Sequence, residues 1–347
     1  MKSFEPTSNN YRLVLIFAIV MFCSFAQAGK QVSKTTAKSP PKIVAKAAAD
    51  ETSEIPSGVK KTVPEFVAKL KERINKLGYK WDLSVFVNDG WEVGGYSIDG
   101  YPLLYWKCGD PEKNPNSSLV LSAVHGDEVT PIFYGFRLVE WVKARPELCK
   151  DKSIVIAPIV NPDGFMRYSK GTRTNFNKVD INRNFDTPDW AVNAQKLWKE
   201  RYQSLRRYYP GDKGGSEPET VFQQWLITTY KPVKIMSVHA PLNMLDYDGP
   251  ADQRTISFVK TYIDSCETLK EAVKKATPEL RFYAYGLFPG SLGNYAGRQR
   301  GIPVLTAELP SIDPALAAHY FSVLENGTRT FFEYKLKDSP IRSVTNQ

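Results

Sequence analysis

Cysteine and histidine are scarce in this chain of 347 residues, which has four cysteines and three histidines. No two cysteines have the CxxC spacing of thiolate metal sites, which argues against such a site. The N-terminal apolar run LVLIFAIVMFCSFA has 14 residues, whereas a membrane span needs about 20. A basic patch interleaved with aromatic residues is also lacking in the body of the chain. We therefore expect no nucleic-acid partner.

The formal net charge of +9 is unevenly distributed along the chain. Residues 1–28 carry +1 and residues 29–62 carry +4, which leaves +4 for the remaining 285 residues. The high isoelectric point is therefore mainly a property of the N-terminal region. A basic tail of this kind can lie near an anionic envelope surface.

The N-terminus has the pattern of an export signal. Lys2 and Arg12 precede the apolar run, and AQA-G follows it as a small-x-small cleavage site. We predict a signal peptide at 1–28, cleaved after Ala28, and an exported protein that is periplasmic or secreted. No stable membrane span is expected after cleavage, and an uncleaved anchor is the alternative.

Three cysteines remain after signal cleavage, namely Cys108, Cys149 and Cys266. An odd number allows at most one disulfide, and the sequence does not say which two cysteines would pair. Buried structural cysteine is the expectation for each.

Residues 29–62 are rich in Lys, Ala, Thr, Ser and Pro and show no apolar periodicity. Such a composition buries too little surface to offset chain entropy. We predict a disordered linker over 29–62, either a tether across the envelope or a dispensable tail, followed by a catalytic domain over 63–340.

The pattern within 63–340 predicts an α/β fold. Apolar residues at helical spacing indicate a helix over 63–77, stopped by Gly78. Buried strands alternate with helices, which is typical of a mixed, mostly parallel sheet covered by helices on both faces. Expected strands lie at 81–87, 91–98, 101–109, 117–125, 152–160, 233–239 and 303–309. Further helices are expected at 130–144, 218–230, 257–276 and 314–337.

Several residues that bear reactive or metal-binding groups lie where these buried strands end. His125 and Glu128 form an HxxE pair after one strand, His239 ends another, and Glu308 a third. In parallel sheets, sites collect at the carboxyl ends of strands. Two histidines and one glutamate with an open fourth position make a catalytic zinc site, and zinc acidifies water and polarises a carbonyl. HxxE alone is a weak signal, so the rest of the chain must decide.

The rest of the chain resembles the zinc carboxypeptidase family of the A/B type over roughly residues 95–335. Seven ordered segments carry the resemblance: HGDE at 125–128, NPDG at 161–164, GTRTNFNKVDINRNF at 171–185, GGSEPET at 214–220, SVHAP at 237–241, YGLFPGS at 285–291 and TAELP at 306–310. The resemblance implies one Zn²⁺ ion held by His125, Glu128 and His239.

The resemblance also implies two catalytic residues. Glu308 matches the general base and acid, which takes a proton from water and gives it to the leaving amine. Arg173 matches the guanidinium that stabilises the oxyanion of the tetrahedral intermediate.

Three further positions match residues of the family that hold substrate. Asn182 and Arg183 match the pair that grips the terminal carboxylate, a task suited to the planar fork of arginine. Tyr285, six residues before Ser291, matches the mobile tyrosine that closes over substrate. Tyr283 lies nearby and is expected to be a packing residue.

Other segments are expected to be architectural. NPDG predicts a tight turn. Ser216 and Glu219 have capping-box spacing, with Pro218 in the first helical turn. Glu217 and Glu219 are assigned structural roles, with charge neutralisation of nearby arginines as the alternative. His319 is expected to be a structural histidine.

Within the family, the chain is most similar to bacterial murein peptide amidases and γ-D-glutamyl-diaminopimelate peptidases. HAPLNMLDYDGPA and YGLFPGSLGNYAG carry this likeness. It implies a murein stem peptide as substrate, with Arg183 and Asn182 on the carboxylate of diaminopimelate. Asp246 and Asp248 are candidates for its distal amine, or else form a solvated turn. Leu292 matches a position that lines the specificity pocket and leaves an apolar or aromatic C-terminal residue possible.

Three competing functions stay open. They are a carboxypeptidase acting on protein-derived peptides, a zinc deacylase of the aspartoacylase kind, and a wall-binding module without activity. Against the last stand the intact ligands and Glu308. The sequence does not indicate the oligomeric state.

Overall fold

The computed structural model describes residues 58–250, 260–283 and 286–340. Its centre is an eight-stranded sheet with the order β1-β2-β4-β3-β5-β8-β6-β7. The strands are β1 (Glu92–Tyr96), β2 (Pro102–Cys108), β3 (Ser117–Ser122), β4 (Ser153–Ala157), β5 (Lys234–His239), β6 (Met244–Asp248), β7 (Arg281–Phe282) and β8 (Val304–Glu308). The α-helices are α1 (Val63–Lys76), α2 (Val129–Lys143), α3 (Pro162–Met166), α4 (Gln195–Glu200), α5 (Pro218–Tyr230), α6 (Lys260–Ala276) and α7 (Ala317–Glu333). Within the three described ranges, no helix is long and apolar enough to cross a membrane.

The sheet is mixed, with a parallel centre. Neighbouring strands run parallel from β4 through β3 and β5 to β8. β2 is antiparallel to β4 at one side, and β6 is antiparallel to β8 at the other. The predicted fold class is confirmed. Because the four central strands are parallel, their carboxyl ends meet at one edge of the sheet.

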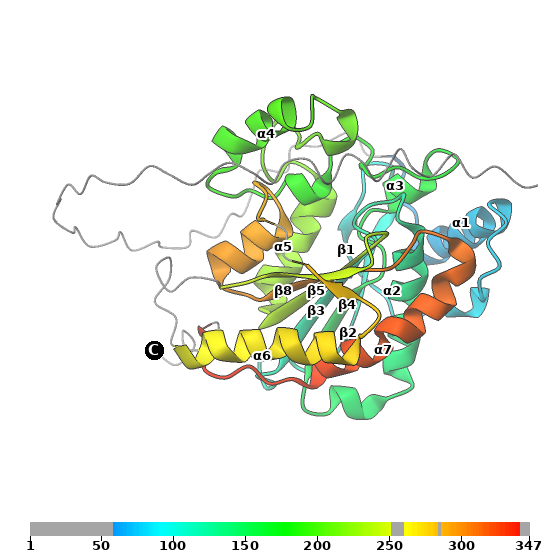
Figure 1. Cartoon of the computed structure of the whole chain (residues 1–347). Coiled ribbons are helices and arrows are strands. Elements are labelled where there is room, and N and C mark those ends of the chain that lie inside the picture. Colours follow the sequence, from blue (N-terminus) through cyan, green and yellow to red (C-terminus); the bar gives the residue numbers. More distant parts are fainter. Residues whose placement is uncertain (1–57, 251–259, 284–285, 341–347) are drawn as a thin grey trace, which may run out of the picture. The chain divides into compact units, whose positions relative to one another are not determined.

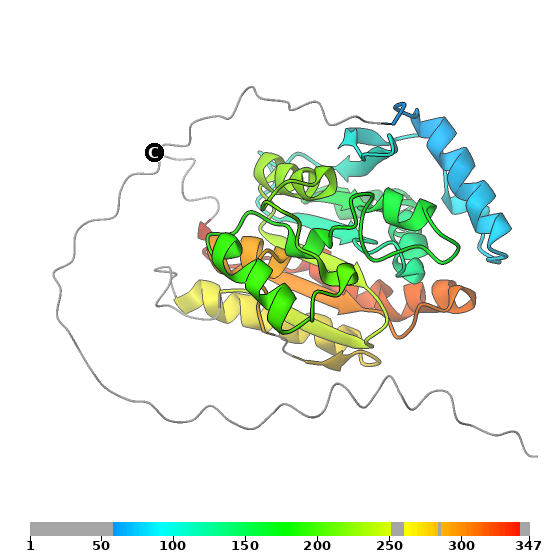
Figure 2. The same cartoon turned by 90° about the horizontal axis from the view of Figure 1, so that it is seen from above.

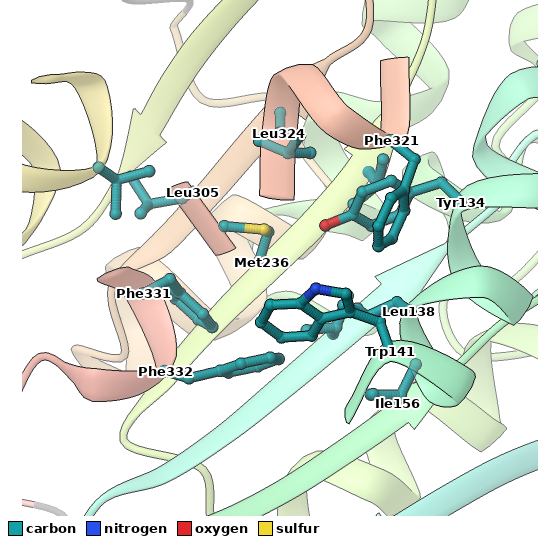
Figure 3. Packing of buried hydrophobic residues seen from close by; sticks show 14 of the residues in the cluster. Tyr134, Leu138, Trp141, Ile156, Met236, Leu305, Phe321, Leu324, Phe331 and Phe332 are labelled. Atoms are coloured by element: carbon teal, nitrogen blue, oxygen red, sulfur yellow. The ribbon is translucent and has the colours of Figure 1, made fainter. Parts of the chain in front are cut away.

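Helices cover both faces of the sheet because the central strands are apolar on both sides. In β3, Val120 packs in the cluster that includes α2, α6 and α7, whereas Leu119 and Leu121 pack in the cluster that includes α5. Figure 1 shows α6 and α7 below the sheet and α5 above it, and Figure 2 gives the view from above. The larger cluster brings Met236 of β5 against Phe331 of α7 (Figure 3).

The first helix forms as predicted, and its N-terminus explains why it begins at Val63. Thr62 is the N-cap and forms a capping box with Glu65. Phe66 and Leu70 pack in one cluster with Phe136 of α2. Ordered contacts already begin inside the range assigned to the linker, because the amide of Gly58 donates to the carbonyl of Ile98 at 2.8 Å. The signal peptide and the linker up to residue 57 lie outside the described residues.

Some local predictions were wrong. Residues 81–87 do not form a strand, because Asp82 caps a 3₁₀ turn at Leu83–Val85. NPDG is not a simple turn: the Asn161 side chain accepts from the Gly164 amide and begins helix α3. The strand expected at 117–125 is β3, which ends at Ser122, so His125 lies in the connection to α2. β6 and β7 were not expected as strands.

The three cysteines of the described chain divide into a pair and a single residue. Cys108 at the end of β2 and Cys149 after α2 form a disulfide. Both are half-buried, so the expectation of buried structural cysteine was wrong for them. It is confirmed for Cys266, which is free and buried in α6. The disulfide links two segments that are 41 residues apart in sequence.

A buried polar network anchors the loop at 171–185 to the start of α5. The Asn175 amide donates to Glu217 at 2.7 Å and to Glu219 at 2.9 Å. The predicted capping box is absent: the N-cap is Glu217, and no side chain caps the helix. Pro218 does lie in the first turn. The structural roles expected for Glu217 and Glu219 are confirmed by these contacts.

Glu219 makes stability depend on pH. It is fully buried, and its Oε1 has no hydrogen-bond partner in the described chain. Burial, together with the Asp163 carboxyl, raises the pKa of Glu219 from an ordinary 4.5 to about 8. The folded state therefore holds the Glu219 proton more tightly than the unfolded state. The contribution of Glu219 to the free energy of unfolding falls as the pH rises from about 4.5 to about 8.

We expect Glu219→Gln to remove this loss, because glutamine keeps the shape without the charge. The melting temperature should rise by at least about 2 °C at pH 8, and by less at pH 5. Calorimetry at both pH values measures the effect, with Glu72→Gln on exposed α1 as the control. An equal shift at the two pH values would contradict the assignment.

Candidate metal centre and active site

Two neighbouring parallel strands bring the three predicted ligands together. His125 lies three residues beyond β3, Glu128 directly precedes α2, and His239 is the last residue of β5. β3 and β5 pair in register, with Ser122 opposite Val238. The two histidines therefore lie at the same edge of the sheet, and the short turn before α2 places Glu128 beside them.

The ligand atoms of these residues point at one another. His125 Nδ1 lies 2.7 Å from Glu128 Oε1, and His239 Nδ1 lies 2.9 Å from Glu128 Oε2. The two Nδ1 atoms are 3.2 Å apart. All three residues are buried, and one ligand atom from each lies within 4.8 Å of the others. Two imidazoles and a carboxylate in this arrangement fit a catalytic zinc ion, which takes three protein ligands and keeps a position open.

The ring nitrogens that point away from the ligand set have polar partners of their own. His125 Nε2 lies 3.3 Å from Asp180 Oδ1, and His239 Nε2 lies 2.9 Å from Ser237 Oγ. With its hydrogen on Nε2, toward the Asp180 carboxylate, His125 would present the lone pair of Nδ1 to an ion. A hydrogen on His239 Nε2, toward Ser237, would leave the lone pair of His239 Nδ1 for the same ion.

Asp180 joins the metal ligands to Arg173. Arg173 Nε donates to Asp180 Oδ2 at 2.8 Å, and Arg173 Nη1 lies 3.6 Å from Glu128 Oε1. Asp180 is fully buried, and burial opposes its charge. The Arg173 guanidinium and the His125 hydrogen bond outweigh this and hold the pKa of Asp180 below its ordinary value. Sequence reasoning missed Asp180, although it lies only two residues before Asn182 in the DINRNF segment.

Glu308 is held beside the ligands by strand pairing. It ends β8 and lies opposite His239 of β5 in the parallel register. Its Oε2 accepts from the Leu242 amide at 3.4 Å. Burial, with the Glu128 carboxylate nearby, raises the pKa of Glu308 to about 7. The structure thus brings the predicted acid–base residue into the same cleft as the ligand set.

Asn182 and Arg183 lie in a 3₁₀ turn at Ile181–Arg183, on the wall of this cleft. Asn182 Oδ1 accepts from the Leu292 amide at 2.9 Å. Arg183 Nη1 donates to the Asn182 carbonyl at 2.7 Å. Arg183 Nε is buried and has no hydrogen-bond partner within the described residues. A buried donor without a partner is costly, so this guanidinium is poised for an acceptor from outside the chain.

The cleft of about 610 Å³ also contains the predicted aspartates. Asp246 and Asp248 are not in a solvated turn, because they lie on β6, two residues apart and therefore on one face of the strand. Asp246 is buried. Burial and Asp246 raise the pKa of Asp248 to about 7, although Arg183 acts in the opposite direction. Leu292 is 3% exposed and lines the same cleft. Tyr285 lies outside the described residues.

Residues that were not predicted complete the rim of the cleft. Arg201 and Tyr202 follow α4, Arg207 and Tyr208 lie in the next 3₁₀ turn, and Phe288 faces them from the loop before Ser291. These rim residues are not positions to which the resemblance assigns a role, so the sequence analysis did not predict them. His319 is exposed near the start of α7, and it is not part of the metal-binding group found among the described residues.

Comparisons with known proteins agree with this geometry. A family model described as zinc carboxypeptidase matches residues 91–306. Murein peptide amidase A of Vibrio campbellii is 29% identical over 224 residues, 64% of this chain and 80% of the relative. The Escherichia coli K12 protein of the same name is 29% identical over 242 residues, 67% of this chain and 88% of the relative.

Two solved structures show the fold. Bovine thrombin-activatable fibrinolysis inhibitor, in complex with tick carboxypeptidase inhibitor, aligns with a TM-score of 0.55 at 18% identity. The alignment covers 79% of this chain and 96% of that one. Carboxypeptidase A from Helicoverpa armigera aligns with a TM-score of 0.53 at 17% identity, covering 78% and 72%.

Asp180 should contribute to zinc affinity although it is not a ligand. Asp180→Asn keeps an acceptor for His125 Nε2 but loses the charge that orients Arg173 and the imidazole. We expect zinc affinity to fall roughly 10-fold to 100-fold, measured by competition with a chromogenic chelator. Asp89→Asn, at an exposed aspartate, is the control. Unchanged affinity in Asp180→Asn would show that Asp180 does not support the metal centre.

Proposed function

Because the chain belongs to the zinc carboxypeptidase family, we propose that it is an exported metallopeptidase that cleaves murein stem peptides. The bond would be the amide between γ-D-glutamate and diaminopimelate, next to a free carboxylate. The observation that carries this proposal is the charge pattern of the cleft. On one wall lies the Arg183 guanidinium, whose buried Nε–H has no hydrogen-bond partner among the described residues, and two aspartates lie on β6.

The chain's own residues supply most of the proposed chemistry. When bound, zinc supplies a Lewis acid that polarises a carbonyl oxygen and acidifies water. Glu308, with its pKa raised to about 7, accepts a proton from the attacking water and delivers it to the leaving amine. Arg173 Nη1, which lies beside the ligand set, donates to the oxyanion that develops at the carbonyl.

Arg183 and Asn182 hold the substrate carboxylate in this proposal. Within the described residues the Arg183 guanidinium donates one hydrogen bond, to the Asn182 carbonyl, and keeps Nε for a ligand. A carboxylate accepts two parallel hydrogen bonds from one edge of a guanidinium, and this fixes the direction of the bound peptide. The enzyme would therefore cut one bond upstream of a carboxylate.

The aspartates on β6 favour a released residue with an amine. Asp246 and Asp248 line the same cleft as Arg183, whose charge opposes the rise in the pKa of Asp248 that burial and Asp246 cause. An ammonium group in the side chain of the substrate is a favourable partner for carboxylates in this position. Diaminopimelate carries such an amine. The names of the curated relatives, murein peptide amidase A, support the same substrate class.

Export is supported by the redox chemistry of the cysteines. The Cys108–Cys149 disulfide is of a kind that persists in oxidising compartments and is rare in the cytosol. This agrees with the signal pattern at residues 1–28, and murein is accessible in such a compartment.

A carboxypeptidase acting on protein-derived peptides is the second candidate, favoured by the apolar side chain of Leu292 in the cleft. The same ligands and Glu308 would serve it. An aspartoacylase-like deacylase is disfavoured by the family match over residues 91–306.

Comparing substrates separates the two candidates. L-Ala-γ-D-Glu-diaminopimelate should be hydrolysed with a kcat/KM at least about 100-fold above that of a blocked dipeptide ending in Phe, because only the former supplies an amine to the aspartates. Mass spectrometry identifies the released residue. Faster hydrolysis of the Phe peptide would favour the second candidate.

Glu308→Gln should abolish turnover while zinc remains bound. Glutamine keeps the hydrogen bond from the Leu242 amide but accepts no proton, so kcat should fall at least about 100-fold. Zinc content and melting temperature serve as controls for the centre and the fold. Full turnover by this variant would overturn the proposed role.

A further inference from the structure

Four arginines line the cleft, and they differ in what they contact within the described chain. Arg173 pairs with Asp180, and Arg207 lies 3.5 Å from Asp127. Neither Arg183 nor Arg201 pairs with an acidic side chain among the described residues. Arg183 is assigned to the terminal carboxylate of substrate, which leaves Arg201 as a second guanidinium that lines the cleft and has no acidic partner in the part of the chain that the structure describes.

Aromatic rings hold Arg201 near Arg183. Its guanidinium carbon lies 5.4 Å from the ring centroid of Phe288 and 5.8 Å from that of Tyr202. The guanidinium carbon of Arg183 lies 4.4 Å from the same Phe288 ring. The two carbons are therefore no more than about 10 Å apart, the sum of the two distances to Phe288. A guanidinium resting on a ring keeps its N–H edges free for a carboxylate.

This spacing suits an amino acid with a carboxylate at each end. The two carboxyl carbons of diaminopimelate are separated by five carbons, roughly 7 Å when extended. One carboxylate on Arg183 would place the other within reach of the Arg201 side chain. The distal amine of the same residue would face Asp246 and Asp248 on β6. The cleft thus offers one partner for each of the three charges that this residue carries in the substrate, where its other amine is part of the scissile amide.

We propose that Arg201 binds the distal carboxylate of the residue released by hydrolysis, and so selects a dicarboxylic amino acid over a plain diamino acid. The inference rests on the proposed function, because it assumes that Arg183 holds the other carboxylate. Arg201 is then a specificity residue: it contacts substrate but takes no part in proton transfer.

Two stem peptides isolate this interaction. L-Ala-γ-D-Glu-meso-diaminopimelate and L-Ala-γ-D-Glu-L-Lys share the scissile bond and the distal amine, and only the former has the distal carboxylate. The native chain should prefer the diaminopimelate peptide by roughly tenfold or more in kcat/KM. Arg201→Gln should lose that preference while its kcat/KM for the lysine peptide stays within about twofold of native.

Two further variants provide matched controls. Lys199→Gln removes one positive charge from α4, two residues away and outside the cleft lining, and should keep the native preference. Arg201→Lys keeps the charge without the planar fork and should keep part of the preference. Melting temperatures of all variants show whether the fold is intact.

The possible results separate the two levels of the proposal. If Arg201→Gln keeps the native preference, or loses activity equally on both peptides, the assignment of Arg201 is wrong and the proposed function stands. If the native chain cleaves neither peptide, the proposed function fails, and the assignment of Arg201 fails with it. A lost preference with unchanged cleavage of the lysine peptide supports both.

Discussion

Two imidazole nitrogens and one carboxylate converge in a buried space at the carboxyl ends of β3 and β5, and most of the surrounding structure serves that convergence. Buried polar groups are stable only when they have partners. Asp180 and Ser237 lie within hydrogen-bond distance of the Nε2 atoms of His125 and His239, and Arg173 donates to Asp180. These partners fix the ring orientation, so the ligand atoms face one point.

The loop that carries Asp180 needs support of its own, because it has little regular structure. That support comes from the network that joins Asn175 to Glu217 and Glu219 at the start of α5. Glu219 is fully buried there, and burial, together with the Asp163 carboxyl, raises its pKa to about 8. Burying Glu219 lowers the stability of the fold, but the network that contains it holds in place the loop that carries both Arg173 and Arg183.

The fold could be predicted from sequence because it depends on local signals, whereas the ligand set was implied by the resemblance of seven ordered segments to the zinc carboxypeptidase family. Apolar runs followed by His239 and Glu308 indicate both the strand and the edge at which it ends. Asp180 carries no such signal, since its role arises from contacts with His125, 55 residues away in sequence. Asp246 and Asp248 were ambiguous because a short strand with alternating acidic residues resembles an Asp-rich turn. Arg201 follows a helix with no buried face, where sequence alone indicates only a solvent-exposed cation.

The central claim is that His125, Glu128 and His239 hold one zinc ion. The most direct measurement is the metal content of the purified native chain and of His239→Ala, each supplied with zinc and then desalted. The account predicts about one zinc per native chain and far less in the variant, because two remaining ligands hold zinc weakly. A native chain without zinc, or a variant that still holds one zinc per chain, would contradict it.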